Sequence, residues 1–243
     1  MKLTQLQKDL IFGSLLGDGN LQTGSKGRTW RYRALQKSEH KEYLLHKYEI
    51  LKPLCNANPK QDTIQDKRTV NSSLNHSEAV IYKSSVARLK EGQSSYFGIY
   101  KRDYFNTLTI PSLKFFADMF YTYDSKQQKW IKDVPLKTQT FLNPRALAYF
   151  YMDDGVLKWL GHSNAMRICT ENFSLEGVKR IQKSLKNLYN IDTGLTKKTL
   201  KNGKVGFRIT IPETSSHTFR DLIKPHLVEC MKYKVSDGNY GHL

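Results

Sequence analysis

The sequence predicts an α+β protein built from two repeats, each of which runs helix, strands, helix, strands, helix. Four anchors recur in the same order in both halves. They are an apolar helix that ends in Asp-Gly, a helix that begins at a serine, the tripeptide Thr-Ile-Pro before a further helix, and a lysine beyond it. A single shared anchor would be a coincidence, but four in the same order favour a tandem duplication.

The positions of these anchors define the two halves. Asp18 and Asp154 end the apolar helices, and Thr-Ile-Pro ends at Pro111 and Pro212. The spacing from aspartate to proline is 93 residues in the first half and 58 in the second, so the first half carries about 35 extra residues. We therefore expect repeats at residues 1–140 and 141–243, with an insertion in the polar segment around 52–92.

The elements of the first half begin with a helix over 5–17, because Thr4 and Gln7 form a possible capping box and Gly19 is a stop. Alternation then predicts a strand over 30–36 with one basic face. The remaining expectations are a helix from Ser38 to about Leu51, weak strand signals near 79–82, strands near 95–100 and 105–110, a helix over 112–123, and a basic linker through Lys132.

The second half begins with a helix whose N-cap is Asn143, whose first residue is Pro144 and whose stop is Gly155. Asn202-Gly203 between two alternating segments is the strongest hairpin signal in the chain. The remaining expectations are a strand over 166–170, a helix from Ser174 to about Tyr189, strands over 193–200 and 204–211, and a helix from 213 or 214 to about 227.

The charge of the chain points to a polyanionic partner. Of 243 residues, 39 are Lys or Arg and 22 are Asp or Glu, giving a formal net charge of +17 and a pI near 9.7. Nucleic acid is the usual partner of such a protein, and a membrane surface is the competing interpretation. No apolar stretch is long enough to span a bilayer, and the N-terminus lacks the apolar core of a signal peptide. Three scattered cysteines favour reduced thiols, so we expect an intracellular protein that is not secreted.

Both apolar helices carry a negative charge at the C-terminal end, where the helix dipole is already negative. Asp18 and Asp154 stand at helix C-termini, where the macrodipole disfavours an anion by roughly 0.3–1 kcal/mol. If the repeats pack around a pseudo-twofold axis, the two carboxylates meet, and they repel unless a proton or a divalent cation lies between them. Oxygen ligands of this kind suit Mg²⁺. The sequence therefore predicts a shared metal site at the junction of the repeats.

The two helix ends, Ile11–Gly19 and Leu147–Gly155, resemble the two motif copies of the LAGLIDADG homing endonucleases, in the single-chain branch that carries both motifs. The segments 132–135 and 224–234 are also similar to the family pattern. The resemblance implies two αββαββα halves forming a saddle on double-stranded DNA, with the motif helices at the interface. It further implies hydrolysis of both strands across the minor groove by a monomer.

The resemblance also implies the residues of the site. Asp18 and Asp154 would bind Mg²⁺, for which Mn²⁺ would substitute, with help from the main-chain oxygens of Gly17 and Asp153. The carboxylate of Asp153 is ambiguous, because it could also pair with a lysine. The expected basic catalytic residues are Lys132, which follows Pro111 by 21 residues, and Lys234, which follows Pro212 by 22.

The candidates for DNA contact are basic and polar residues of the predicted strands, because a twisted sheet can follow the major groove. For any one of them, a solvated sheet face is the alternative. The candidates are Arg31, Arg33 and Gln36 in the first half, and Arg167, Thr170, Lys197, Thr199, Arg208 and Thr210 in the second.

The predicted function is that of an intron-encoded, site-specific DNA endonuclease. The alternative is a maturase that keeps the fold, binds its host intron RNA and does not cleave. Two acidic helix ends favour the enzyme, since a pure binding protein gains nothing from two anions that face a polyanion. The expected compartment is an organelle, mitochondrion or chloroplast, or the bacterial cytoplasm.

Overall fold

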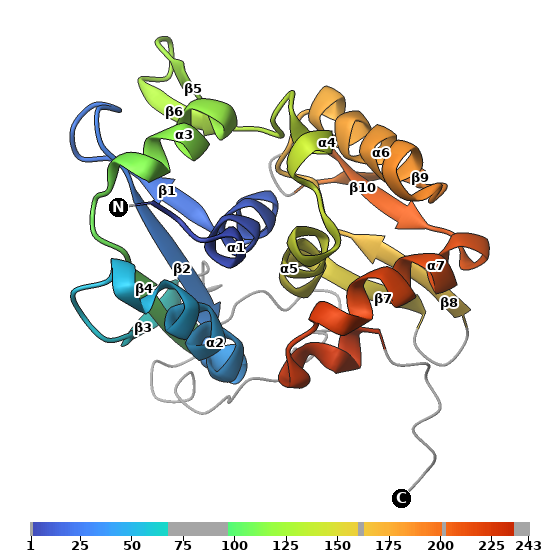
Figure 1. The fold of residues 1–243 in the computed structure, drawn as a ribbon, viewed down its shortest axis with the longest axis horizontal. Coiled ribbons are helices and arrows are strands. Elements are labelled where there is room, and N and C mark those ends of the chain that lie inside the picture. Colours follow the sequence, from blue (N-terminus) through green and yellow to red (C-terminus); the bar gives the residue numbers. More distant parts are fainter. Residues whose placement is uncertain (1, 68–96, 160–162, 201–202, 236–243) are drawn as a thin grey trace, which may run out of the picture.

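Two antiparallel sheets lie on either side of a central pair of helices in the computed structural model, which describes residues 2–67, 97–159, 163–200 and 203–235. Helices α1 (Gln5–Leu16) and α5 (Pro144–Asp154) lie side by side between the sheets (Figure 1). Each sheet has four strands and is covered by helices on the face that points to this pair. Among the described helices, none is long and apolar enough to cross a membrane.

The two halves repeat the same αββαββα order, which confirms the predicted fold class. After α1 the first half contains β1 (Asn20–Gln22), β2 (Arg31–Lys37), α2 (Lys41–Leu51), β3 (Lys60–Lys67), β4 (Phe97–Asn106) and α3 (Pro111–Phe120). After α5 the second contains β7 (Gly155–Trp159), β8 (Ser163–Ile168), α6 (Leu175–Tyr189), β9 (Gly194–Thr199), β10 (Val205–Ile211) and α7 (Glu213–Ile223). The strand orders, β1-β2-β4-β3 and β7-β8-β10-β9, are equivalent under the repeat.

The connection between the halves consists of the hairpin β5 (Tyr121–Asp124) and β6 (Lys129–Lys132), followed by the short helix α4 (Thr138–Phe141). The sequence had predicted a basic linker here. The division at residues 140 and 141 stays a prediction. After α7, the 3₁₀ turns η3 (Lys224–His226) and η4 (Glu229–Lys234) lead back to the end of α5.

The predicted caps of the two central helices are confirmed. Thr4 and Gln7 form the capping box of α1, with Oγ1 of Thr4 accepting from the Gln7 amide at 3.2 Å and Oε1 of Gln7 accepting from the Thr4 amide at 3.0 Å. Asn143 Oδ1 accepts from the amide of Ala146 at 2.9 Å and so begins α5. Both helices are buried on nearly all sides, because a sheet and the partner helix flank each of them.

Small residues allow the central helices to approach closely. A Cβ added to Gly13 would stand 2.2 Å from the carbonyl oxygen of Ala146, and one added to Gly17 would stand 2.5 Å from Cβ of Asp153. Main-chain atoms and a Cβ cannot move aside as the end of a flexible side chain could. Glycine at both positions therefore sets the distance between α1 and α5.

Five strands were missed by sequence reasoning, and all of them are polar or at the edge of a sheet. β1 and β7 follow the acidic helix ends directly and are too short for a periodic pattern. β3 is almost entirely polar and lies at the edge of its sheet, inside the segment interpreted as an insertion. β5 and β6, which form one hairpin, were missed because the sequences of both strands alternate only weakly.

Other predicted boundaries also change. The expected strands near 95–100 and 105–110 are parts of one strand, β4, and the helix expected over 112–123 ends at Phe120 because the chain enters β5. β3 and β9 are equivalent strands, so the extra length of the first half is reduced to the connections that flank β3. The weak strand signal at 79–82 and residue Asn202 lie outside the described residues, although β9 and β10 pair as the hairpin prediction required.

Candidate functional site

The two acidic helix ends meet at one place. Asp18 follows α1 and stays accessible to solvent, and Asp154 is the last residue of α5. Loss of hydration, followed by the charges of Asp18 and Asp153, raises the pKa of the Asp154 carboxyl to about 8. The pKa of the Asp18 carboxyl is raised as well, first by loss of hydration and then by Asp153. The carboxylates are therefore close enough to repel each other, as the helix pair predicted.

Gln36 lies at this acidic site and not on the outer face of its sheet. Alternate residues of β2 point to opposite faces, and Gln36 is buried on the helix side, where its Nε2 donates to Oδ2 of Asp18 at 3.0 Å. Thr170, at the equivalent position of the second half, is also buried and donates to the main-chain oxygen of Phe207. The interpretation of Gln36 and Thr170 as DNA contacts is corrected by this geometry.

Two lysines hold the main chain at the ends of the central helices. Lys132, at the end of β6, donates from Nζ to the carbonyl oxygens of Gly17 and Gly19, each at 3.0 Å. Lys234, at the end of η4, donates to the carbonyl oxygens of Met152 at 2.6 Å and Asp153 at 3.1 Å. The sequence-predicted pair thus lies at equivalent places on the two sides of the site.

Burial lowers the pKa of both ammonium groups, and the surrounding carboxylates oppose this. For Lys132 the opposing charges are Asp154, Asp153 and Asp18, in that order, and for Lys234 they are Asp153, Asp154 and Asp18. The negative charges of all three aspartates therefore act on each lysine. The site is one electrostatic unit in which these two lysines and Lys47, whose charge also acts on Asp18, face three anions.

The ambiguity of the Asp153 side chain has a structural answer. Its Oδ1 accepts from Nζ of Lys47 at 2.6 Å, and both side chains are almost completely buried, at 0% and 1% exposure. The main-chain oxygen of the same residue points the other way, to Lys234. Of the four predicted metal-binding groups, Asp153 can therefore offer its carbonyl oxygen, while its carboxylate belongs to an ion pair.

The donor set fits a hard divalent cation. Asp18 and Asp154 supply two carboxylates, and Gly17 and Asp153 supply carbonyl oxygens that each keep a second lone pair beside the lysine hydrogen bond. Among the described residues, no group of three or more His, Cys, Asp or Glu side chains is arranged to hold a metal ion. One or two carboxylates, completed by water and phosphate oxygens, is the usual environment of Mg²⁺.

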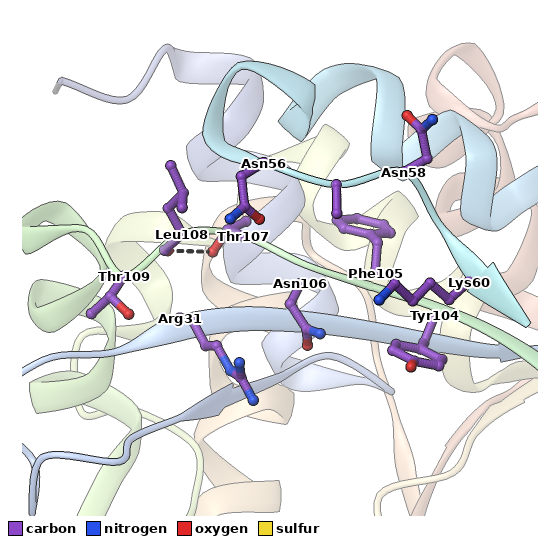
Figure 2. Close-up of a pocket in the computed structure, with 11 residues that line it drawn as sticks. Arg31, Asn56, Asn58, Lys60, Tyr104, Phe105, Asn106, Thr107, Leu108 and Thr109 are labelled. Carbon is purple, nitrogen blue, oxygen red and sulfur yellow. Dashed lines mark hydrogen bonds between the residues drawn. The ribbon is translucent and has the colours of Figure 1, made fainter. Parts of the chain in front are cut away.

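The outer face of the first sheet is polar and basic. The register of β2 and β4 places Arg33 opposite Asn106, and the guanidinium of Arg33 lies 4.6 Å from the ring centroid of Tyr104. Nε and Nη2 of Arg31 donate to Oε1 of Gln22 on the neighbouring strand β1, at 3.2 and 3.1 Å. A pocket lies beside these side chains, and Figure 2 shows Arg31, Asn106 and Tyr104 pointing to one side of the sheet.

On the second sheet only part of the predicted set shares one face. Arg167 and Thr210 are register partners, and Arg208 lies two residues before Thr210 on the same face, paired with Glu171. Lys197 is the register partner of Phe207, so it lies on the opposite face together with Thr199. Thr196 and Lys198, the residues next to Lys197 in the sequence, lie on the face of Arg208 and Thr210. The hydroxyls of Thr196 and Thr210 are 3.0 Å apart.

Lys47 was missed because a lysine on a helix is usually solvated. Its spacing from Tyr43 and Leu44 was the available signal, since residues three and four apart share a helix face and both of those are buried. Lys60, Tyr104 and Asn106 were also missed, because β3 and the end of β4 were not recognised as parts of one strand pair. The register places Lys60 opposite Tyr104.

The model of the LAGLIDADG DNA endonuclease family matches residues 8–219. The chain belongs to this family. Its two LAGLIDADG motifs are the end of α1 with Asp18, which follows it, and the end of α5, whose last residue is Asp154. This confirms the resemblance found in the sequence. As the motif helices of this LAGLIDADG protein, α1 and α5 form both the junction of the repeats and the floor of the acidic site.

Two relatives of this LAGLIDADG protein carry names of different kinds. It is 64% identical over 245 residues to "DNA endonuclease I-ChuI" of Chlamydomonas applanata, covering 100% of both chains. It is 26% identical over 233 residues to "Cytochrome b mRNA maturase bI2" of Saccharomyces cerevisiae, covering 95% of this chain and 47% of the yeast protein. The chain thus spans about half of the length of that maturase.

A solved structure shares the fold. The homing endonuclease I-WcaI, bound to its DNA recognition sequence, superposes with a TM-score of 0.69 at 19% sequence identity, covering 97% of this chain and 88% of that one. The pseudo-symmetric architecture of the two halves is therefore that of a single-chain homing endonuclease.

Proposed function

We propose that this LAGLIDADG protein is a site-specific endonuclease that hydrolyses both strands of a long double-stranded DNA target, as a monomer and with Mg²⁺. The observation that carries the proposal is the convergence of Asp18 and Asp154 at the ends of α1 and α5, between two polar sheet faces. The name of the 64% identical relative, a DNA endonuclease, supports the same activity. Mn²⁺ is expected to substitute for Mg²⁺, because it also prefers octahedral oxygen sites.

Asp18 and Asp154, with the main-chain oxygens of Gly17 and Asp153, are the groups that would hold the metal. A divalent ion bound there would polarise the scissile phosphate, lower the pKa of a water nucleophile and neutralise charge on the leaving oxygen. The pKa of Asp154 is raised first by loss of hydration and then by the charges of Asp18 and Asp153, and a bound cation would offset that repulsion. Asp18 is held in place for this role by Gln36.

Lys132 and Lys234 have a double role in the proposed reaction. Each fixes the main chain at the end of one motif helix through two hydrogen bonds, and each places a positive charge next to the carboxylates. A fixed cation close to the scissile phosphate stabilises the additional negative charge of the transition state. The arrangement repeats on both sides of the site, which suits a reaction at two strands.

The outer sheet faces are proposed to hold the DNA. Arg31 and Arg33 in the first half, and Arg167, Arg208 and Thr210 in the second, lie on faces that point away from the helices. Phosphate contacts would supply most of the affinity and base contacts the specificity. Because the two sheets are related by the repeat, the target is expected to be pseudo-palindromic.

A maturase function is the second candidate, supported by the name of the yeast relative. Host intron RNA would then be a partner. A protein that only binds RNA gains nothing from keeping Asp18 and Asp154 together, at a cost in electrostatic repulsion. We therefore rank cleavage first. An intron-encoded origin and an organellar or bacterial location follow from the same proposal.

The test is a cleavage assay on DNA that joins the exons flanking the gene, with Mg²⁺, Ca²⁺ and EDTA compared. We expect one double-strand cut in Mg²⁺ and none in EDTA. Asp18→Asn and Asp154→Asn should each abolish cleavage and leave most of the DNA affinity, because neither removes a sheet-face contact. Near-normal cutting by either variant would overturn the assignment of the metal site. Splicing of the host intron in the absence of any cleavage would favour the maturase.

A further inference from the structure

The ion pair between Lys47 and Asp153 connects the two halves at the edge of the acidic site. Lys47 comes from α2 of the first half, and Asp153 from α5 of the second. The Nζ to Oδ1 distance is 2.6 Å, and the second carboxylate oxygen, Oδ2, is buried without a hydrogen-bond partner in the described part of the chain. The ammonium group also lies 4.3 Å from the ring centroid of Tyr43.

An ion pair this deeply buried is a poor source of stability. Removing both ions from water costs several kcal/mol per ion, and the attraction between them regains this cost only in part. Asp153 could have been a neutral residue if packing alone were needed. The best-attested use of a buried ion pair is to fix the register of two packed elements, and the neighbouring contacts point to that use here.

Lys47 is one of three residues of α2 that hold α5. The ring nitrogen Nε2 of His46 lies 3.0 Å from the hydroxyl of Tyr149, and the hydroxyl of Tyr43 donates to the main-chain oxygen of Tyr149 at 3.5 Å. Tyr149 lies one helical turn before Asp153 on the same face of α5. The contacts at two successive turns therefore prevent α5 from sliding along, or rotating against, the first half.

The register of α5 matters because Asp153 contacts Gly17 of the first half and directly precedes Asp154 in the sequence. Its Cβ is the atom that a side chain at position 17 would meet, and its main-chain oxygen accepts from Lys234. A shift of Asp153 therefore shifts Asp154 directly and changes the contact with Gly17, the residue before Asp18.

We propose that Lys47 is a positioning residue of the nuclease, which fixes α5 in register with the first half through Asp153 and so sets the separation of the Asp18 and Asp154 carboxylates. The inference rests on the proposed endonuclease function. Lys47 is almost completely buried against Asp153 and lies on neither outer sheet face, so its removal should slow the chemical step and leave DNA binding unchanged. A displacement near 1 Å costs up to about 10²-fold in rate.

The experiment compares Lys47→Met, the double variant K47M/D153N and the wild-type protein. Three quantities are measured for each: the melting temperature, the Kd for target DNA in Ca²⁺, and the single-turnover cleavage rate in Mg²⁺. Lys41→Met is the matched control, because it removes an exposed lysine from the same helix. It should match the wild-type protein in all three measurements.

Lys47→Met leaves a buried unpaired carboxylate, so we expect a lower melting temperature, a cleavage rate reduced about 10- to 100-fold, and an unchanged Kd. In the double variant neither charge is buried, and the melting temperature should recover toward that of the wild type. The positioning role predicts that its cleavage rate does not recover. If K47M does not fold, the double variant alone decides the question.

Recovery of the cleavage rate together with the melting temperature in the double variant would show a purely structural pair and overturn the proposal. A wild-type rate in K47M would do the same. If the wild-type protein itself does not cut DNA, the proposed nuclease function fails, and that failure is visible before any variant is compared.

Discussion

Gln36 Nε2 donates a hydrogen bond of 3.0 Å to Oδ2 of Asp18, and the described residues of the second half contain no equivalent bond to Asp154. Thr170, at the corresponding strand position, donates to the main chain of Phe207. The two carboxylates of the site are therefore held differently, although the lysines beside them are arranged alike. An asymmetric site in a pseudo-symmetric frame has consequences for the order of strand cleavage.

Gln36→Leu is expected to uncouple the two strand cuts. Loss of a hydrogen bond to a charged group costs about 1.5–3 kcal/mol, so the carboxylate of Asp18 should act roughly 10- to 100-fold more slowly, while Asp154 keeps its surroundings. Nicked DNA should then accumulate in a single-turnover time course. Thr170→Val is the control, because it removes the equivalent side-chain donor without touching either aspartate. Uniform slowing of both strands in Gln36→Leu would contradict the expectation.

Asp154→Asn should stabilise the metal-free protein above neutral pH. The folded-state pKa of Asp154, about 8, lies above the ordinary value of 3.8. This group therefore favours the folded state below pH 4, and the contribution is lost as the pH rises through about 8. In EDTA at pH 9 we expect the variant to melt on the order of 2–4 °C higher, the shift for roughly 1 kcal/mol at this size.

The advantage of Asp154→Asn should be smaller at pH 5 than at pH 9, and Mg²⁺ should reduce it by stabilising the wild-type protein. Melting curves at both pH values, with and without Mg²⁺, check this. A gain of equal size at both pH values would show that charge repulsion is not its cause.

Gly13→Ala tests the contact between the motif helices away from the acidic site. The added methyl group would stand 2.2 Å from the main-chain oxygen of Ala146, so α1 and α5 must separate. Overpacking of this kind costs about 1–3 kcal/mol, and thermal unfolding should show it as a lower Tm. Gly24→Ala is the matched control, since nothing lies within 4 Å of the added atom. Equal melting temperatures for the two variants would be evidence against a tight helix contact.

The salt dependence of DNA binding tests the length of the binding surface. If the two sheet faces neutralise about ten phosphates, the slope of log Kobs against log salt should be about −9. Titrations in Ca²⁺ at several salt concentrations give this slope without cleavage. A slope flatter than about −3 would mean that only one short segment of a sheet contacts the DNA.

The helices of the site could be predicted from the sequence because their signals are local. The Thr4 capping box and the Asn143 cap are short patterns that form as expected. Gly155 ends α5 as expected, whereas α1 ends at Leu16 with Gly17, and not Gly19, as its C-cap. The repeated order of the anchors predicted that Asp18 and Asp154, which lie far apart in the chain, come together. The hairpin of β9 and β10 was predictable for the same reason as the caps.

The rest depends on contacts that no local pattern contains. The carboxylate of Asp153 pairs with Lys47 of the other half, and no local pattern reveals that partner. Lys197 and Thr199 were expected on the same face as Arg208 and Thr210. In the register of β9 against β10, Lys197 pairs with Phe207, so both residues lie on the opposite face. Edge strands such as β3 lack an apolar face, so they resemble loops until their partner strand is known.

Gly17 and Asp153 occupy equivalent positions in the two repeats, and they touch each other. Two copies of the second half, paired in the same way, would bring two aspartate side chains into the space that glycine leaves open. Two copies of the first half would leave that space empty and Lys47 without its acid. The halves of this chain have thus become complementary and are no longer interchangeable. A chimaera that combines one half of this protein with a half of another family member would need to match residues 17, 47 and 153 together.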